Sequence, residues 1–166
     1  WFMMLGLADI KDWLKQLDVV SVSDLQKMSV KELNNLTLKQ LSKDSCFSAD
    51  YFYIGKLDNK KDKSIGVYQL ERSSNLTIAI GGLNTTKTME KSVSILIHWN
   101  TNAKETELKA LDLYNKLLCL RNFKINDIKI NFIKLLVPEP IDVGTDSKNI
   151  YERVIQATFY YEKKEE

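Results

Sequence analysis

The sequence predicts an α+β fold, with a mostly antiparallel sheet of about five to six strands, an N-terminal helix and one long helix that crosses the sheet. Three observations lead to this prediction. Apolar residues recur at helical spacing near the start of the chain and again over 102–121. Alternating apolar and polar residues, typical of half-buried strands, fill several stretches between and after these helices. Polar turns join the first four strands, so we expect hairpins and antiparallel pairing there.

Length and composition indicate one domain over residues 1–166. Of the 166 residues, 44% are apolar and 28% are charged, which argues against a disordered chain, a collagen or a coiled-coil rod. No apolar run approaches the roughly 20 residues of a membrane helix. The net charge of +2 is too balanced for a protein that binds nucleic acid mainly through bulk charge. We therefore expect a soluble protein with neither a membrane nor a specific nucleic-acid partner.

Residues from about 4 to 18 are predicted to form an amphipathic helix. Its apolar side chains follow spacings of four and three, and they are Met3, Leu7, Ile10, Leu14 and Leu17. The apolar residues 1–7 do not resemble a secretory signal, because no basic residue begins the segment and Asp9, Lys11 and Asp12 follow at once. We therefore interpret them as the start of the helix.

Residues 21–44 contain a repeat of eight residues, which we place in a helical insertion over 21–46 of the domain. Each unit opens with Ser or Thr and has Asp, Glu or Gln three residues later, as in a helix capping box. The opening residues are Ser21, Ser29 and Thr37, and their partners are Asp24, Glu32 and Gln40. One continuous helix is the alternative, but a period of eight does not match 3.6 residues per turn. We therefore predict three short stacked helices.

Strands dominate the rest of the chain. Four are expected before the long helix, over 51–57, 65–70, 76–80 and 93–99. Two more are expected after it, over 125–137 and 150–161. Pro138 ends the first of these, and a loop over 141–149 that contains Gly144 follows. The last strand is predicted to place on one side Tyr151, Arg153, Ile155, Ala157, Phe159 and Tyr161.

The long helix is predicted to begin at Asn102, a capping residue with Glu105 three positions later, and to run to about Arg121. Two i,i+4 pairs in the favourable order support it. These pairs are Glu105–Lys109 and Asp112–Lys116. Its buried face is expected to consist of Leu108, Leu111, Tyr114, Leu117 and Leu118.

The segment Gly81–Thr88 is the strongest candidate for a phosphate-binding loop. It follows a predicted strand and matches the pattern G-x-x-x-x-G-K-[ST], except that Thr86 replaces the second glycine. That glycine matters, because the loop backbone adopts conformations that a Cβ atom disfavours. A P-loop also needs a following helix, whereas residues 92–99 are typical of a strand. We interpret Gly81–Thr88 as a polar hairpin loop rather than a nucleotide site.

Other reactive side chains are few. His98 is the single histidine, and without a G-x-S-x-G motif we expect it to be structural. Cys46 and Cys119 have no CxxC spacing and are expected to be free thiols in a reducing compartment, a disulfide and a Cys–His pair being the alternatives. The loop over 58–64 lacks EF-hand spacing, and its lysines have no aromatic partner for nucleic acid. No catalytic residue, metal site or cofactor is predicted.

Several short motifs resemble one known family. They are Tyr53–Asp58, Ile65–Tyr68, Ile80–Thr86, Ser94–Asn100 and Glu105–Glu107. From about Tyr51 to about Leu120, the chain resembles the phage minor capsid protein family, whose members are similar to tail terminator proteins. The expected first helix and last two strands are consistent with this resemblance, whereas the repeat over 21–44 is an addition to it.

The resemblance implies a tail-terminator-like fold and a structural role without catalysis. Tail terminators form a ring, typically a hexamer, which caps the head-proximal end of the tail tube, stops polymerisation and offers a docking face for the head. The implied partners are further copies of the chain, the tail tube protein, and sheath and neck or connector proteins. Assembly is expected in the bacterial host cytoplasm, in a phage or in a headless, contractile tail-like particle with this protein as its collar.

Two alternatives stay open. In the first, the protein is a head–tail connector or minor capsid protein of the neck. In the second, it is a small cytosolic enzyme or nucleotide-binding module, and this depends on Gly81–Thr88. The residues of an oligomer interface are not predicted. For the repeat over 21–44, a decoration of the ring and a contact for a neck protein are both open.

Overall fold

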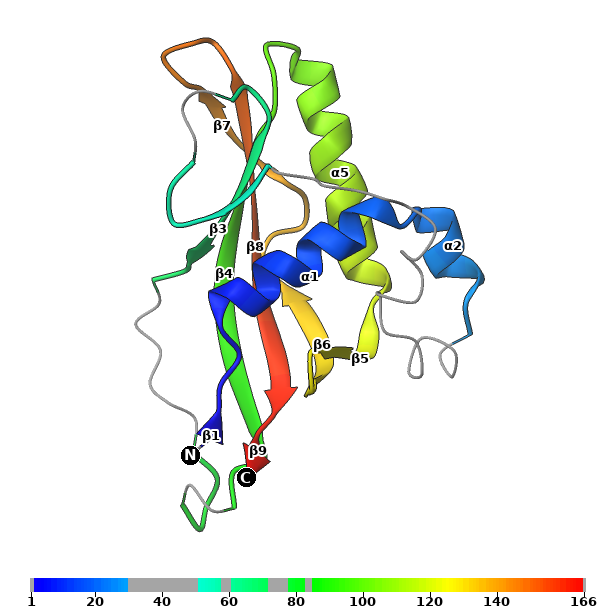
Figure 1. Ribbon diagram of the computed structural model, residues 1–166, viewed down its shortest axis with the longest axis vertical. Helices are drawn as coiled ribbons and strands as arrows, with labels where there is room; N and C mark the ends of the chain where they lie inside the picture. Colours follow the sequence, from blue (N-terminus) through cyan, green and yellow to red (C-terminus); the bar gives the residue numbers. More distant parts are fainter. Residues whose placement is uncertain (1, 30–50, 58–60, 72–77, 83–84, 166) are drawn as a thin grey trace.

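A computed structural model describes residues 2–29, 51–57, 61–71, 78–82 and 85–165 of the chain. The elements in chain order are β1 (Phe2–Met3), α1 (Leu7–Val19), α2 (Val22–Lys27), β2 (Phe52–Ile54), β3 (Ser64–Gln69), β4 (Thr88–His98), α5 (Ala103–Cys119), β5 (Arg121–Ile125), β6 (Ile128–Leu135), β7 (Ile141–Thr145), β8 (Tyr151–Glu162) and β9 (Lys164–Glu165). The long strands β4 and β8 run side by side at the centre of the main sheet (Figure 1). The helices α1 and α5 pack against this sheet. The predicted α+β class is confirmed.

The main sheet has seven strands among the described residues, in the order β2-β3-β4-β8-β6-β5, with β7 also paired to β8. β4 pairs with β8 along its whole length, from Thr88 opposite Glu162 to His98 opposite Glu152. The other edge of β8 is shared, because β7 pairs with its first part and β6 with its last. These pairs, and those of β3 with β4 and β5 with β6, are antiparallel, which confirms the predicted mostly antiparallel sheet.

The pairing of β2 corrects the expectation that the first strands form hairpins. β2 and β3 are parallel, with Phe52 opposite Ile65. At the end of β2, Gly55 has a φ of 68°, and its amide still donates to Val67 at 3.1 Å. The chain therefore does not reverse in a tight turn there, and β3 starts beside the start of β2. The strand predicted over 76–80 is also wrong in its described part, since 78–80 lie outside any strand.

The core lies between the sheet and the helices. Every second side chain of β4 and β8 is buried over the central part of the sheet, as predicted, and these are Val93, Ile95, Ile97, Ile155, Ala157, Phe159 and Tyr161. From α1, Trp13 stacks on Phe123 of β5 with ring centroids 4.9 Å apart. The same ring meets Phe159 of β8 edge-on at 5.8 Å. Removal of this apolar surface from water fixes α1 to the sheet.

The first helix begins at Leu7 rather than near residue 4. The chain before it pairs as β1 with β9, so Met3 belongs to a strand instead of the helix stripe. The Asp9 carboxylate accepts a hydrogen bond from the Gly6 backbone N–H at 2.9 Å, which satisfies one of the amides that a helix start leaves unpaired. The buried side chains of α1 are Ile10, Trp13, Leu14 and Leu17.

The long helix α5 starts where the sequence predicts, because the Asn102 side-chain oxygen accepts hydrogen bonds from the backbone N–H groups of Lys104 and Glu105. Its orientation about its own axis differs from the prediction. Leu108 and Leu118 are 56% and 53% exposed, although both were expected in the core. The buried side chains of α5 are Thr106, Ala110, Leu113, Tyr114, Lys116 and Leu117. This rotation turns two lysines of the helix toward an aspartate on α1, and it leaves the two leucines in solvent.

Replacing Asn102 with alanine is expected to lower the free energy of unfolding by about 1 kcal/mol, because two backbone amides lose their acceptor. Asn115, exposed in the middle of α5, is the matched control. Asn115→Ala should be neutral or slightly stabilising, since alanine favours helix more than asparagine does. Urea unfolding of both variants checks this difference, and equal losses would contradict the capping role.

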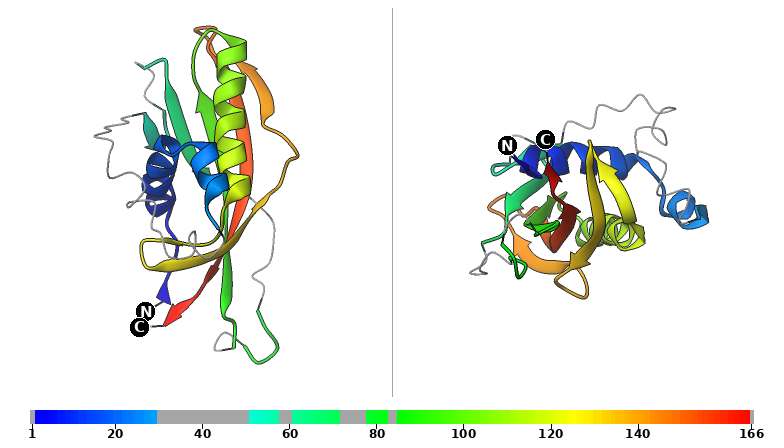
Figure 2. Two further views of the ribbon diagram at one scale, coloured as in Figure 1. Left: turned by 90° about the vertical axis from the view of Figure 1, so that its right-hand side faces the viewer. Right: turned by 90° about the horizontal axis from the view of Figure 1, so that it is seen from below.

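Two predictions for the region after α5 are corrected. The stretch 125–137, expected as one strand, contains the turn of the β5–β6 hairpin, where Asn126 takes a φ of 53°. Asparagine tolerates this left-handed conformation better than most residues do. The loop expected over 141–149 contains β7, which pairs with β8 through a bulge between Asp142 and Gly144. In Figure 2 the hairpin turns beneath α1 and α5, nearly across the direction of β8.

Part of the predicted repeat lies within the described residues. The Ser21 hydroxyl accepts a hydrogen bond from the Asp24 backbone N–H at 3.1 Å, so the predicted cap of the first short helix is confirmed. α2 ends at Lys27, and Met28 has extended backbone. α2 packs against α5 and buries Leu25. The rest of the repeat after Ser29, and Cys46, fall in 30–50, outside the described residues.

Candidate functional site

His98 and Asp146 form a pair at one end of the sheet. His98 is 7% exposed, and its Nε2 atom lies 3.1 Å from Asp146 Oδ2. Asp146 Oδ1 accepts hydrogen bonds from the backbone N–H groups of Ile150 and Lys148 at 2.9 and 2.8 Å. The bond from Ile150, and after it the contact with His98, hold the pKa of Asp146 below its ordinary value. The pair fastens the turn before β8 to the end of β4.

This lowered pKa predicts an acid-dependent contribution to stability. The contribution of Asp146 should be present above its ordinary pKa of 3.8 and should be lost as the pH falls through the lower pKa of the folded state. Between pH 6 and pH 3, the native protein should therefore lose more unfolding free energy than Asp146→Asn does. Asp62→Asn, at an exposed position, is the control and should follow the native protein. Identical pH profiles for all three proteins would contradict this account.

The loop that begins at Gly81 folds on itself. Gly81 and Gly82 have φ values of 114° and 87°, which side chains with a Cβ disfavour. The hydroxyls of Thr85 and Thr86 both donate to the Gly82 carbonyl, at 3.0 and 3.1 Å. A strand follows the loop, as predicted, but β4 begins at Thr88, five residues before the predicted strand over 93–99. A strand therefore occupies the place where a P-loop has its helix N-terminus.

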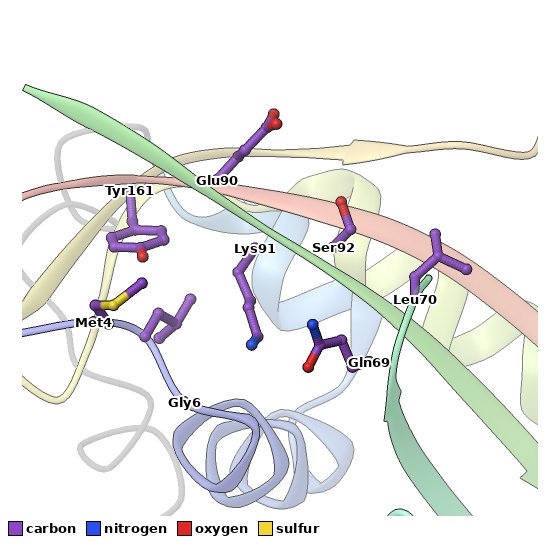
Figure 3. A pocket seen from close by; sticks show the side chains of 9 residues that line it. Met4, Gly6, Gln69, Leu70, Glu90, Lys91, Ser92 and Tyr161 are labelled. Carbon is purple, nitrogen blue, oxygen red and sulfur yellow. The ribbon is translucent and has the colours of Figure 1, made fainter. Parts of the chain in front are cut away.

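A hollow of about 490 Å³ lies between the start of α1, the end of β3 and β4 (Figure 3). Lys91 and Gln69 lie on its inner side, whereas Glu90 and Ser92 point to the other side of β4. Its other lining residues are Met4, Leu5, Gly6, Leu70 and Tyr161. One ammonium and one amide do not make the acid–base pair or activated nucleophile of an enzyme site.

Two further kinds of site find no support in the part of the chain that the structure describes. Within 2–29, 51–57, 61–71, 78–82 and 85–165, no three His, Cys, Asp or Glu side chains gather as a metal ion would need. In the same ranges no helix combines the length and the apolar character that crossing a membrane requires. Cys119 is a free, partly buried thiol.

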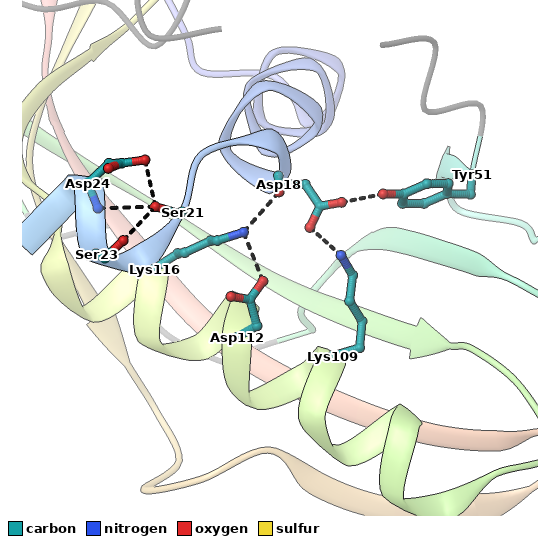
Figure 4. A network of polar contacts seen from close by, with 8 residues as sticks. All are labelled: Asp18, Ser21, Ser23, Asp24, Tyr51, Lys109, Asp112 and Lys116. Carbon is teal, nitrogen blue, oxygen red and sulfur yellow. Dashed lines mark hydrogen bonds and ion pairs between the residues drawn. The ribbon is translucent and has the colours of Figure 1, made fainter. Parts of the chain in front are cut away.

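A buried polar network joins α1, α5 and the residue before β2 (Figure 4). The Asp18 side chain is 4% exposed and accepts hydrogen bonds from the Lys109 ammonium, at 2.5 Å, and from the Tyr51 hydroxyl. Lys116 donates to the Asp18 backbone oxygen at 2.9 Å and lies 2.8 Å from Asp112, which confirms the predicted Asp112–Lys116 pair. Burial, followed by the bond to Asp18, raises the pKa of Tyr51.

This network also joins residues on the two sides of the predicted insertion over 21–46. Asp18 precedes that segment in the chain and Tyr51 follows it, and the hydrogen bond between their side chains holds the two positions together. Lys109 and Lys63 both lie over the Trp99 ring, 4.9 and 5.2 Å from its centroid, and add cation–π contacts beside the network. These contacts stabilise the packing of α5 against the residues around Asp18 and Trp99. They engage the Lys109 ammonium of α5 in the interior.

The outward side of the β5–β6 hairpin is exposed and basic. The term hairpin face is used here for Arg121, Lys124, Lys129, Phe132 and Lys134, which are all exposed. Phe132 is 45% exposed and stacks on Tyr160 of β8, with centroids 4.5 Å apart. Lys124 lies directly opposite Lys129, an arrangement that weakens a strand pair, and Lys129 is 2.5 Å from Glu162. Basic side chains thus surround the Phe132 ring, which is partly exposed to water.

The outward side of α5 is exposed and acidic. The term helix face is used here for Lys104, Glu105, Glu107, Leu108, Asp112 and Leu118. Lys109 turns inward to Asp18, whereas Lys116 bonds to the Asp18 backbone oxygen and also pairs with Asp112, so the remaining carboxylates of this face are Glu105 and Glu107. The face also carries the two leucines that are more than half exposed. Exposed apolar side chains that cluster on one surface often mark a protein–protein contact.

Neither face is predicted by the sequence analysis, although signals for both are present. The basic residues of the hairpin face are visible in the sequence, but one long strand over 125–137 does not place Lys124 beside Lys129. Leu108 and Leu118 follow the spacing of an amphipathic helix, and this spacing alone predicts that they are buried. Only the orientation of α5, set by its contacts with α1 and the sheet, separates buried from exposed leucines.

The comparison with known protein families agrees with this picture of a chain built for contacts. A family model described as bacteriophage tail terminator protein matches residues 15–163. The matched span includes α2, α5, both faces defined above and every strand of the main sheet. No curated protein and no solved structure matches the chain significantly.

Proposed function

The chain belongs to the bacteriophage tail terminator family, and we propose that it forms a ring that caps the head-proximal end of the tail tube and stops tube polymerisation. Membership in the family indicates a structural protein of a phage tail, which supports a role in assembly. The observation that carries the proposal is the extent of the family match, which runs from residue 15 to residue 163.

The described surface supports an assembly role. The polar side chains of the Asp18 network and of the His98–Asp146 pair bind one another. The network joins α1 to α5, and the pair joins the end of β4 to the turn before β8. Three of the exposed apolar side chains lie on the two charged faces, Phe132 on the basic hairpin face and Leu108 with Leu118 on the acidic helix face. A capping protein needs such surfaces, because it works by binding its neighbours.

The proposed partners are further copies of the chain, in a ring of six, and the end of the tail tube. Sheath and neck proteins would meet the same ring from outside and above. Assembly would take place in the cytoplasm of the bacterial host, in a phage or in a headless tail-like particle. In the headless case the ring would be the collar of the particle.

The experiment that tests capping is the length distribution of tubes, measured by negative-stain electron microscopy in producing cells that lack this gene. Long tubes of irregular length are expected, because nothing would stop the addition of tube subunits. Expression of the wild-type chain from a plasmid should restore one uniform length.

Tubes of normal, uniform length in the deletion strain would overturn the capping role. If such tubes accumulated beside unattached heads, the protein would instead be a head–tail connector or minor capsid protein of the neck. A nucleotide-binding assay with Lys87→Ala tests the enzyme alternative, and nucleotide binding by the native chain that this variant loses would favour it.

A further inference from the structure

We propose that the hairpin face of one copy binds the helix face of the next copy, and that this contact joins neighbouring subunits of the ring. The inference rests on the proposed function, because it names the surfaces by which a ring of this protein would close. Each surface carries exposed apolar side chains, Phe132 on one side and Leu108 with Leu118 on the other. Each also has a rim of one dominant charge.

Charge complementarity identifies the partner. The hairpin face combines Phe132 with one arginine and three lysines, one of which pairs with Glu162. The helix face combines its leucines with one lysine and three carboxylates, one of which pairs with Lys116. Opposite potentials on two surfaces steer their association and disfavour the pairing of either surface with itself. The basic surface therefore fits the acidic surface of a second copy better than it fits another hairpin face.

The pairing of strands in the hairpin supplies a second argument. Lys124 and Lys129 face each other directly across the two strands, and Lys129 pairs with Glu162 at 2.5 Å. Like charges in this position repel and weaken the hairpin of an isolated chain. The Lys129–Glu162 pair offsets part of this repulsion within the chain, and carboxylates brought by a neighbouring molecule would offset more of it.

The two surfaces of one chain cannot cover each other. The side chains that alternate with the hairpin face, such as Phe123 and Ile125, are buried in the core that α1 and α5 also line. The exposed side chains of the hairpin face therefore lie on the side of the hairpin opposite its buried side chains, and those of the helix face lie opposite the buried side of α5. A contact between two different surfaces is heterologous, and repeated contacts of this kind form a ring when the rotation closes.

Charge reversal tests the contact. The hairpin variant is Lys124→Glu with Lys134→Glu, and the helix variant is Glu105→Lys with Glu107→Lys. The mass of each protein is measured across a concentration series by light scattering after size exclusion. Each variant alone should raise the concentration needed for assembly by about a hundredfold or more, since it places like charges across the contact. The chain that carries both variants should assemble again.

Folding is controlled separately. Lys124→Glu places an acid opposite Lys129, so the urea midpoint of the hairpin variant should be unchanged or higher while assembly falls. The matched control is Lys27→Glu with Lys56→Glu, which makes the same charge change at two exposed positions outside both faces. This control should assemble like the wild-type chain.

Three results would overturn the contact. In the first, both reversed variants assemble at wild-type concentrations. In the second, the hairpin variant assembles normally but loses binding to double-stranded DNA at low salt, which would assign the basic surface to nucleic acid instead. In the third, the wild-type chain stays monomeric throughout the series. None of these three results bears on the capping role, which is tested separately by the tube lengths of the deletion strain.

Discussion

Replacement of Trp13 with alanine should lower the free energy of unfolding by about 4 kcal/mol. Trp13 is 3% exposed and contacts rings on two other elements, Phe123 of β5 and Phe159 of β8. Its removal leaves a cavity at the point where α1 meets the sheet, and the surrounding strands can fill that cavity only in part. Urea unfolding followed by far-UV circular dichroism measures the loss.

Two other substitutions sharpen this test. Trp13→Phe should cost much less than Trp13→Ala, because it keeps a ring in place and removes an indole N–H that has no hydrogen-bond partner among the described residues. Leu108→Ala, at a position that is 56% exposed, should change stability by less than about 1 kcal/mol. If Trp13→Ala cost no more than Leu108→Ala, the assignment of Trp13 to the core would be wrong.

Asp18→Ala is expected to lower the free energy of unfolding by about 3 kcal/mol. The substitution removes the only carboxylate that the structure places on the Lys109 ammonium, and the side chain of Lys109 is 17% exposed. It also leaves the Tyr51 hydroxyl without its acceptor. A buried charge without its partner is costly, whereas the Coulomb gain of a complete pair is largely offset by desolvation.

The control for this prediction is a pair at the surface of the same helix. Lys11 and Asp12 lie 2.9 Å apart, and the Asp12 side chain is 63% exposed. Asp12→Ala should change stability by less than about 1 kcal/mol, because water screens exposed pairs. Asp18→Asn should fall between the two, since the amide oxygen can still accept from Tyr51. Equal losses for Asp18→Ala and Asp12→Ala would contradict the role given to the network.

Strong local patterns made much of the fold predictable. The alternation on β4 and β8 identified their buried faces, because a half-buried strand must alternate. Asn102 and Ser21 were recognised as caps from their own chemistry and that of the residues just after them. In each case the deciding interactions lie within a few residues along the chain, so the sequence displays them.

Long-range interactions account for what the sequence did not show. Lys109 was expected to pair with Glu105 on its own helix, but it bonds to Asp18, which lies on α1. β7 forms because β8 offers an edge beside it, although its own sequence resembles a loop. The candidate surfaces depend on such contacts as well, since the rotation of α5 decides which leucines reach solvent. The family resemblance, in contrast, needed only short motifs.

The central claim is that this protein sits at one end of a tail tube and ends its growth. The most direct measurement is the position of a gold-labelled copy of the chain on purified particles, viewed by electron microscopy. Label at the head-proximal end of each tube, and at that end alone, is the predicted result. Label along the length of the tube, or over the surface of the head, would contradict the claim.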